Sequence, residues 1–388
     1  MMAGRSAASS PKRRPAPIRR TSAPWDPGRP GWPAHPDPSR GRIPEHNPVM
    51  TTLRDVAKLA KVSTCTASKV LSGDTKSRFR PDTADAVRAA AKKLGWTPDH
   101  RARSLRTGKA GAIALITPGV SNSPFSNALI AAADAVLRPT GTSLIMAGGT
   151  RVQGALATAT RLAEERRVDG LLVMSWSLLP EHVTILKGLG LPYAIIGGHN
   201  LGETLPTAKL DDAAGIAAAV THLAELGHRR IAWVGPTHGG KDGLITERRK
   251  AVHRHGQAAG MVVADVEVPV TGPETRNREE VAAAATAVLA AVQGGLDATA
   301  LICYNDLEAN AALYALHSLG RAIPRDISVI GFDNVLAEIT WPSLTTISHE
   351  LEALMQAAVG MVLDSSLPRQ VLVTPRLVVR DSSGPAPA

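Results

Sequence analysis

The sequence is poor in the residues and segments that define several classes of protein. It has two cysteines, Cys65 and Cys303, in 388 residues. They lie far apart without metal-ligand spacing around either, which argues against a disulfide framework and a cysteine-based zinc site. No uninterrupted apolar run reaches the roughly 18 residues that a membrane span needs, and no apolar segment follows the basic N-terminus as a secretion signal requires. We therefore expect a soluble protein of the reducing cytoplasm with no membrane partner.

The composition indicates two modules of unequal size and opposite net charge. A hydrophobic content of 44% over this length supports one small and one large domain. Residues 1–49 carry a net charge of +6 and residues 50–108 a net charge of +8, so residues 109–388 carry −4 of the total of +10. A basic module on an acidic body is typical of a protein that presents one end to phosphates, although a solvated charged face is the alternative on composition alone.

The first 49 residues contain eleven prolines, mixed with Arg, Ser and Gly, and no apolar periodicity. We predict that residues 1–49 are disordered. Two functional interpretations remain: a basic arm that adds non-specific DNA affinity, or an inert tail or start-site artefact, since Met50 directly precedes the first structured motif. We favour the second.

Residues 50–97 predict three short helices. Thr52 and Asp55 have the spacing of a capping box and open the first helix. Ser63 caps a second helix, and a third begins at Pro81, a favoured first helical residue, and stops at Gly95. Each has one apolar stripe. The first two make a helix-turn-helix, and the third closes a small core over them.

These residues carry a strong family resemblance. The stretch Leu53-Arg-Asp-Val-Ala-Lys-Leu-Ala-Lys-Val-Ser-Thr-Cys-Thr-Ala-Ser-Lys-Val-Leu-Ser-Gly73 resembles the headpiece of LacI-type (LacI/GalR family) transcriptional regulators over its whole length. The resemblance implies that the second helix enters the major groove of double-stranded operator DNA. Thr64 and Cys65 would meet base edges first, with Ser68 and Lys69 farther along, and Thr66 would contact phosphates. The DNA-binding residues implied in the headpiece are Thr52, Ser63, Thr64, Cys65, Thr66, Ser68 and Lys69.

Two headpiece positions depart from the family pattern, and a third raises the question of a redox role. Lys69 stands where the family usually has Arg, so a cation is kept but the planar fork that suits guanine is lost. Lys61 replaces a frequent Gly at the turn, which raises the question whether that turn needs a positive φ. Cys65 could act as a redox switch, but we favour a plain small contact residue.

The basic segment over residues 98–109 resembles the family's hinge helix. In that family the hinge becomes helical on the operator, and paired leucines open a central step in the minor groove. Here Leu105 matches the wedge and Ala102 its neighbour, with Arg101, Arg103 and Arg106 near phosphates. A basic linker is the alternative interpretation.

Residues 110–382 predict an α/β body, followed by a disordered tail over 383–388. Short apolar runs alternate with amphipathic helices, as in parallel sheets covered by helices on both faces. Ligands in such folds gather at the carboxyl ends of the strands. The predicted strands are Ala112–Thr117, Ser143–Ala147, Gly170–Met174, Tyr193–Gly197, Arg230–Gly235, Thr299–Tyr304 and Ser328–Phe332.

This body resembles the same family's effector domain, which is similar to periplasmic sugar-binding proteins and has two lobes around a cleft. Its landmarks include Arg167-Val-Asp-Gly170 and Ile323-Pro-Arg-Asp-Ile-Ser-Val-Ile-Gly-Phe-Asp333. We interpret Asp306 as a helix cap, whereas Asp211 and Asp212, at another strand-to-helix turn, could cap or bind. Asp212 stands where Asn is frequent. The residues at cleft positions are Ser121, Asn122, Phe125, Arg248, Asn305 and Asp333.

Two other classes of function fit less well. Gly235-Pro-Thr-His-Gly-Gly-Lys-Asp242 falls short of a phosphate-binding loop because Asp242 stands where a magnesium-binding hydroxyl is needed. His253 and His255 lie on opposite sides of a helix, so they do not form a metal pair. We predict no enzyme activity, no cofactor and no metal. A solute-binding protein for a transporter would share the body but would have no use for the headpiece.

The resemblance implies a repressor-like mechanism. A homodimer would place two second helices in the half-sites of a pseudo-palindrome, in the cytoplasm and associated with the nucleoid. A small-molecule effector in the cleft would change operator affinity through the lobes and hinge. A sugar or sugar derivative is the default, although an aromatic content of 3% leaves few stacking platforms and keeps nucleosides and other polar metabolites open. No heptad follows the last predicted strand, so we expect no tetramer.

Overall fold

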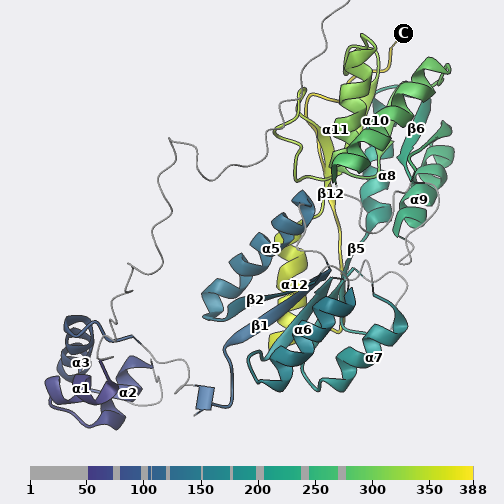
Figure 1. Ribbon diagram of the computed structural model, residues 1–388. Coiled ribbons are helices and arrows are strands. Elements are labelled where there is room, and N and C mark those ends of the chain that lie inside the picture. Colours follow the sequence, from purple (N-terminus) through teal and green to yellow (C-terminus); the bar gives the residue numbers. More distant parts are fainter. Residues whose placement is uncertain are drawn as a thin grey trace, which may run out of the picture. The chain divides into compact units, whose positions relative to one another are not determined.

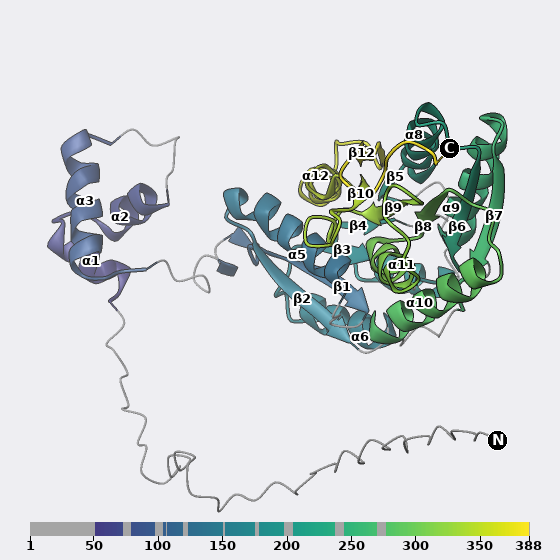
Figure 2. The ribbon, with the colours of Figure 1, turned by 90° about the horizontal axis from the view of Figure 1, so that it is seen from above.

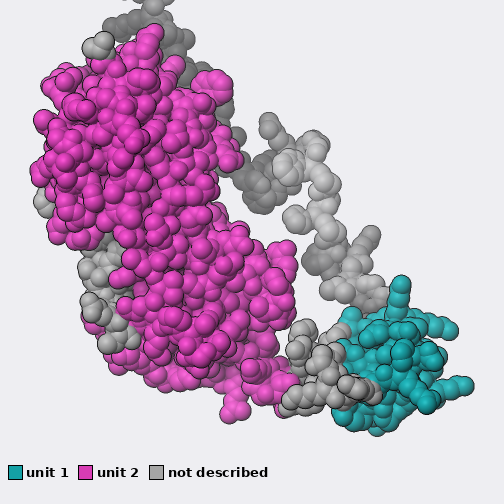
Figure 3. Space-filling view, turned by 180° about the vertical axis from the view of Figure 1, so that it is seen from behind, with its two compact units in different colours: residues 1–98 teal, residues 99–388 magenta. Residues whose placement is uncertain are grey.

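The structure is a computed structural model that describes residues 51–72, 79–97, 104–105, 107–118, 123–149, 152–174, 178–197, 205–236, 244–269 and 277–387. The chain divides into two compact units, one ending at Pro98 and the other beginning at Asp99 (Figure 3). Within the described residues, every helix is too short or too polar to cross a membrane.

The first unit contains the three predicted helices, α1 (Leu53–Leu59), α2 (Thr64–Leu71) and α3 (Pro81–Lys93). The capping box is confirmed: the Thr52 hydroxyl accepts from the Asp55 amide, and the Thr52 amide donates to the Asp55 carboxylate at 2.9 Å. Lys61 has a φ of 53°, so this turn does need a left-handed residue. Seven buried side chains close the core, namely Val56, Ala57, Ala67, Val70, Val87, Ala90 and Ala91.

The second unit has two lobes, each built on a six-stranded sheet. In lobe 1 the strand order is β11-β5-β4-β3-β1-β2, and every described pairing is parallel. Helices α5 and α12 pack together on one face, and α6 and α7 cover the other (Figure 1). The elements of lobe 1 are β1 (Ala112–Pro118), α5 (Pro124–Leu137), η1 (Arg138–Thr140), β2 (Ser143–Gly149), α6 (Val152–Glu164), β3 (Gly170–Met174), α7 (Pro180–Gly188), β4 (Tyr193–Ile196), β5 (Thr207–Leu210), α12 (Leu351–Leu363) and β11 (Gln370–Val373).

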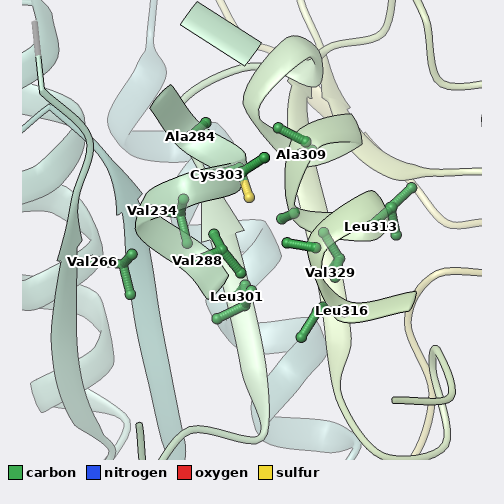
Figure 4. Packing of buried hydrophobic residues seen from close by; sticks show 14 of the residues in the cluster. Val234, Val266, Ala284, Val288, Leu301, Cys303, Ala309, Leu313, Leu316 and Val329 are labelled. Atoms are coloured by element: carbon green, nitrogen blue, oxygen red, sulfur yellow. The ribbon is translucent and has the colours of Figure 1, made fainter. Parts of the chain in front are cut away.

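Lobe 2 repeats this plan with the order β12-β10-β9-β8-β6-β7, in which β12 alone pairs antiparallel among the described strands. Helices α10 and α11 cover one face of the sheet and α8 and α9 the other (Figure 2). Val234, Cys303 and Leu313 belong to the core beneath α10 and α11 (Figure 4). The elements of lobe 2 are α8 (Asp212–Glu225), β6 (Arg230–Gly235), α9 (Leu244–Ala258), β7 (Val262–Glu267), α10 (Asn277–Gln293), β8 (Ala300–Cys303), α11 (Asp306–Ser318), β9 (Ser328–Asp333), β10 (Thr345–Ser348) and β12 (Arg376–Val378).

The chain passes between the lobes three times: from β5 to α8, from β10 to α12, and from β11 to β12. We call these the three crossings. They pack closely, because a Cβ added to Gly215 in the first turn of α8 would lie 2.7 Å from Ile347 Cγ2 and 3.0 Å from Pro375 Cγ. Polar residues at the crossings are therefore held in a crowded place that belongs to both lobes.

All seven predicted strands are present, with ends that agree within two residues. Five strands were missed: β5, β7, β10, β11 and β12. Four of them have only three or four residues, and β5 and β10 begin with threonine, so none forms an apolar run that stands out from its surroundings. Their strand conformation depends on pairing with neighbours far away in the sequence.

The prediction of a disordered tail over 383–388 is wrong for residues 383–387; Ala388 lies outside the described residues. The Gly384 carbonyl lies 3.0 Å from His228 Nε2, and the Ala386 amide donates to the Leu226 carbonyl at 2.8 Å. The Gly384 amide also donates to the Ser328 hydroxyl at 3.1 Å. A composition of Ser, Gly, Pro and Ala is typical of solvated tails, but here the backbone satisfies buried polar groups of lobe 2.

Deletion of residues 384–388 is expected to lower the free energy of unfolding by about 2 to 4 kcal/mol, because four hydrogen bonds are lost and His228 and Ser328 are left without these partners. Urea unfolding followed by tryptophan fluorescence measures the change. Deletion of residues 387–388 is the control, since it removes none of these bonds. Equal stabilities of the two truncated chains would show that the tail does not stabilise lobe 2.

Candidate functional site

Helix α2 presents the predicted contact residues on one surface. Thr64, Cys65 and Lys69 are exposed and Ser68 is half-buried, whereas Ala67 and Val70 face the core. Residues three or four positions apart are neighbours on a helix surface, so Thr64, Cys65, Ser68 and Lys69 form a continuous polar surface. We call Thr64, Cys65, Ser68 and Lys69 the α2 surface.

Among the other predicted DNA-binding residues, two cap helices, one is exposed, and two lie outside the described residues. The Ser63 hydroxyl accepts from the Thr66 amide at 3.0 Å and caps α2, and the Thr52 hydroxyl donates to Asp55 at 2.6 Å. Leu105 belongs to a short helical stretch and is 89% exposed. Arg101 and Ala102 lie outside the described residues.

Of the six predicted cleft residues, Ser121 and Asn122 lie outside the described residues, and three of the others converge. Phe125, at the start of α5, lies edge-on to His349 with ring centroids 4.8 Å apart. Arg248 on α9 contacts His349 as well, and Asp333 ends β9 beside it. The convergence therefore joins lobe 1, lobe 2 and the second crossing, which contains His349.

Arg248 lies at the centre and is 3% exposed. Its Nη2 lies 3.1 Å from Asp212 Oδ1, and its Nη1 donates to the Tyr304 carbonyl at 2.9 Å. The aromatic ring of Phe332 lies 3.7 Å from the guanidinium carbon, which is a cation–π contact. Burial lowers the pKa of Arg248, but Asp212, Tyr304 and Asp333 raise it by more than burial lowers it. The net pKa lies above its ordinary value, so the guanidinium stays charged.

His349 and Asp333 complete the cluster, and Asp333 Oδ1 lies 4.0 Å from Arg248 Nη1. Nε2 of His349 lies 3.2 Å from Arg248 Nη2 and 3.1 Å from Asp333 Oδ1. Burial, followed by the charge of Arg248, holds the pKa of His349 well below its ordinary value. Burial also raises the pKa of Asp333 well above its ordinary value; Arg248 opposes this shift, while Asp306 adds to it.

The tautomer of His349 follows from these contacts. A guanidinium only donates, so the Arg248 contact makes Nε2 of His349 an acceptor and assigns the ring proton to Nδ1. Among the described residues, His349 Nδ1 is buried and has no hydrogen-bond partner.

Asn305 and Asp306 differ from their predicted roles. Asn305 caps α11 by accepting from the Glu308 amide at 2.8 Å and donates to Glu280 at 2.8 Å, so both ends of its amide bind protein groups. Asp306 was expected to cap this helix. Its carboxylate instead accepts from Val335 and Leu336 amides and the Thr346 hydroxyl, which fixes the loop after β9.

Asp211 and Asp212, for which capping and binding were both left open, have different partners in the structure. Asp211 caps α8 by accepting from the Ala214 amide at 3.0 Å, and Asp212 pairs with Arg248. The sequence did not single out His349, which is a lone histidine after a strand. The strand before it, β10, was itself missed, so its position beyond a strand end gave no signal. No group of described His, Cys, Asp or Glu side chains could hold a metal ion.

Comparisons with known proteins agree with these features. Residues 52–99 match the model "Bacterial regulatory proteins, lacI family" and residues 220–383 match "Periplasmic binding protein-like domain". An uncharacterized HTH-type transcriptional regulator in the aml 5' region of Streptomyces limosus is 34% identical over 361 residues, covering 87% of this chain and 95% of the relative.

Two solved structures have similar folds. The transcriptional regulator CelR in complex with cellobiose has a TM-score of 0.58 and 25% identity, over 86% of this chain and 100% of the other. The Lac repressor dimer bound to operator and the anti-inducer ONPF has a TM-score of 0.66 and 22% identity, over 86% and 99%. The headpiece, the two-lobed body and the relative above 30% identity together show that the chain belongs to the LacI family of bacterial transcriptional regulators, which are not enzymes.

Proposed function

We propose that this regulator binds a pseudo-palindromic operator as a homodimer through its α2 surface and responds to a polyhydroxylated, sugar-like effector bound between its lobes, in the cytoplasm and associated with the nucleoid. The observation that carries the proposal is the α2 surface itself. Its four side chains are the base-contacting positions implied by the family headpiece, and the opposite side of α2 packs into the core. A recognition helix needs this arrangement, with readable side chains outward and a rigid support behind them.

The Arg248 cluster supports an effector site. Arg248, Asp333, His349 and Phe125 come from elements of both lobes and offer donors, acceptors and an apolar ring within a small volume. Ligand sites combine such convergent polar groups with apolar surface. CelR is solved with cellobiose, which agrees with a sugar-like effector for this chain.

Exposed apolar side chains in lobe 2 support a homodimer. Trp341 is 96% exposed and Ile339 is 82% exposed in the loop between β9 and β10, and Tyr314 on α11 is 66% exposed. Ala337 of that loop and Leu313 of α11 share one core cluster. Large exposed apolar groups on supported elements are typical of protein interfaces. Leu105, exposed before the body, is proposed to enter the minor groove.

Sequence-specific DNA binding is tested by incubating the chain from Met50 with fragmented DNA from its own source at moderate salt and sequencing the retained fragments. We expect one motif with a symmetric centre, because phosphate contacts alone would retain all DNA and would weaken with salt. Retention of bulk DNA without a motif would contradict sequence reading by α2.

Lys69→Ala is expected to weaken binding to that operator about tenfold to hundredfold and to relax base preference at one position of each half-site, since Lys69 extends from the α2 surface. Competition titrations with single-base operator variants measure both effects. Lys93→Ala, which removes an equal exposed charge from the end of α3, is the control. Preserved base preference in Lys69→Ala would assign Lys69 to phosphate instead.

Trp341→Ser is expected to raise the dimer dissociation constant at least tenfold, because the dimer would lose a large apolar side chain from its interface. Sedimentation velocity over a dilution series measures the constant. Val262→Ser is the control, since Val262 is 67% exposed on the edge strand β7, away from this loop in sequence. A stable monomer of the unaltered chain on operator DNA would contradict the homodimer.

A further inference from the structure

Arg248 is the cation of the proposed effector site, and most of its five N–H donors already contact protein groups. Nε lies 3.3 Å and Nη2 3.1 Å from Asp212 Oδ1, Nη1 donates to the Tyr304 carbonyl, and Nη2 contacts His349. Both charged groups are buried, with 3% of Arg248 and 7% of Asp212 exposed. A buried arginine paired in this way is electrically neutralised within the protein.

The groups around this pair are mainly acidic. Burial raises the pKa of Asp333 first, Asp306, Asp212 and Glu280 add to the rise, and Arg248 opposes it. Glu308, 1% exposed, has its pKa raised by burial first and by Glu280 next. Asp333 and Glu308 therefore add further acidic side chains beside the Arg248–Asp212 pair, and burial raises the pKa of both.

Two buried polar atoms still lack hydrogen-bond partners among the described residues, namely His349 Nδ1 and Glu308 Oε2. Nδ1 of His349 carries the ring proton in the tautomer assigned above, so it is a donor that would suit a hydroxyl or ether oxygen. An uncharged oxygen ligand satisfies such a donor without altering the charge of the cluster.

We propose, building on the proposed effector site, that the effector is an uncharged polyhydroxylated molecule and that Asp212 is the specificity-determining residue that excludes anions. A phosphate or carboxylate brought to Arg248 must either displace Asp212 from the guanidinium or accept a like charge beside it. Like charges in a buried site repel strongly. Hydroxyl groups meet no such penalty.

The decisive variant is Asp212→Asn, which keeps the shape and the hydrogen-bond acceptor but removes the charge. It should raise affinity for anionic probes, glucose 6-phosphate and gluconate, about tenfold relative to the unaltered chain. Affinity for the neutral probes cellobiose and maltose should stay within about threefold. Calorimetric titration and ligand-induced shifts in the melting temperature of the full chain measure both.

Asp211→Asn is the matched control, because it removes the same charge from the neighbouring residue, whose capping of α8 an asparagine also performs. Only Asp212→Asn should gain affinity for the anions. A gain in both variants, a gain in neither, or equal binding of an anionic and a neutral probe by the unaltered chain would overturn the proposal. Retention of a selected operator fragment by all three proteins is measured in parallel, and its loss in the unaltered chain would instead count against the proposed function.

Discussion

The charge of one buried guanidinium constrains the whole effector half of this molecule. Arg248 is almost completely removed from water, and a charge in that position is tolerated only with a close counter-ion and saturated hydrogen bonds. Asp212 supplies the counter-ion from the first crossing, and His349 supplies an acceptor from the second. The ion pair itself lies within lobe 2, and His349 connects it to the second crossing.

The sequence predicted best where the chemistry is local. The capping box at Thr52, the Ser63 cap and the proline at the start of α3 are encoded within three or four residues, and all are present. Apolar runs between helices likewise revealed the buried central strands. The short outer strands and the ordered tail were not predictable this way, because Gly384 and its neighbours are held by partners more than fifty residues away.

The candidate site was predictable in part for a related reason. Arg248 and Asp333 follow a family pattern and do meet, but the same polar groups can serve a helix or a ligand. Asn305 and Asp306 illustrate the ambiguity, since one became the cap and the other fixed a distant loop. Sequence spacing shows that a carboxylate or amide side chain lies beyond a strand end. It does not show which backbone amide or cation will donate a hydrogen bond to that side chain. His349 has no periodic partner, so its role emerges only when the second crossing is seen against α5 and α9.

The crossings also explain why this cluster is well placed to report a bound effector. Glu350, next to His349, has a φ of 49° and pairs with Arg376 of the third crossing at 2.7 Å. The second crossing is therefore held on one side by Arg248 and on the other by Arg376. A molecule that bonds to His349 or Asp333, as proposed, would compete with these contacts. Such a molecule shifts the lobes toward one arrangement only if it binds that arrangement more tightly than the other. If the two arrangements also differ in DNA binding, the effector and the operator change each other's affinity by the same factor.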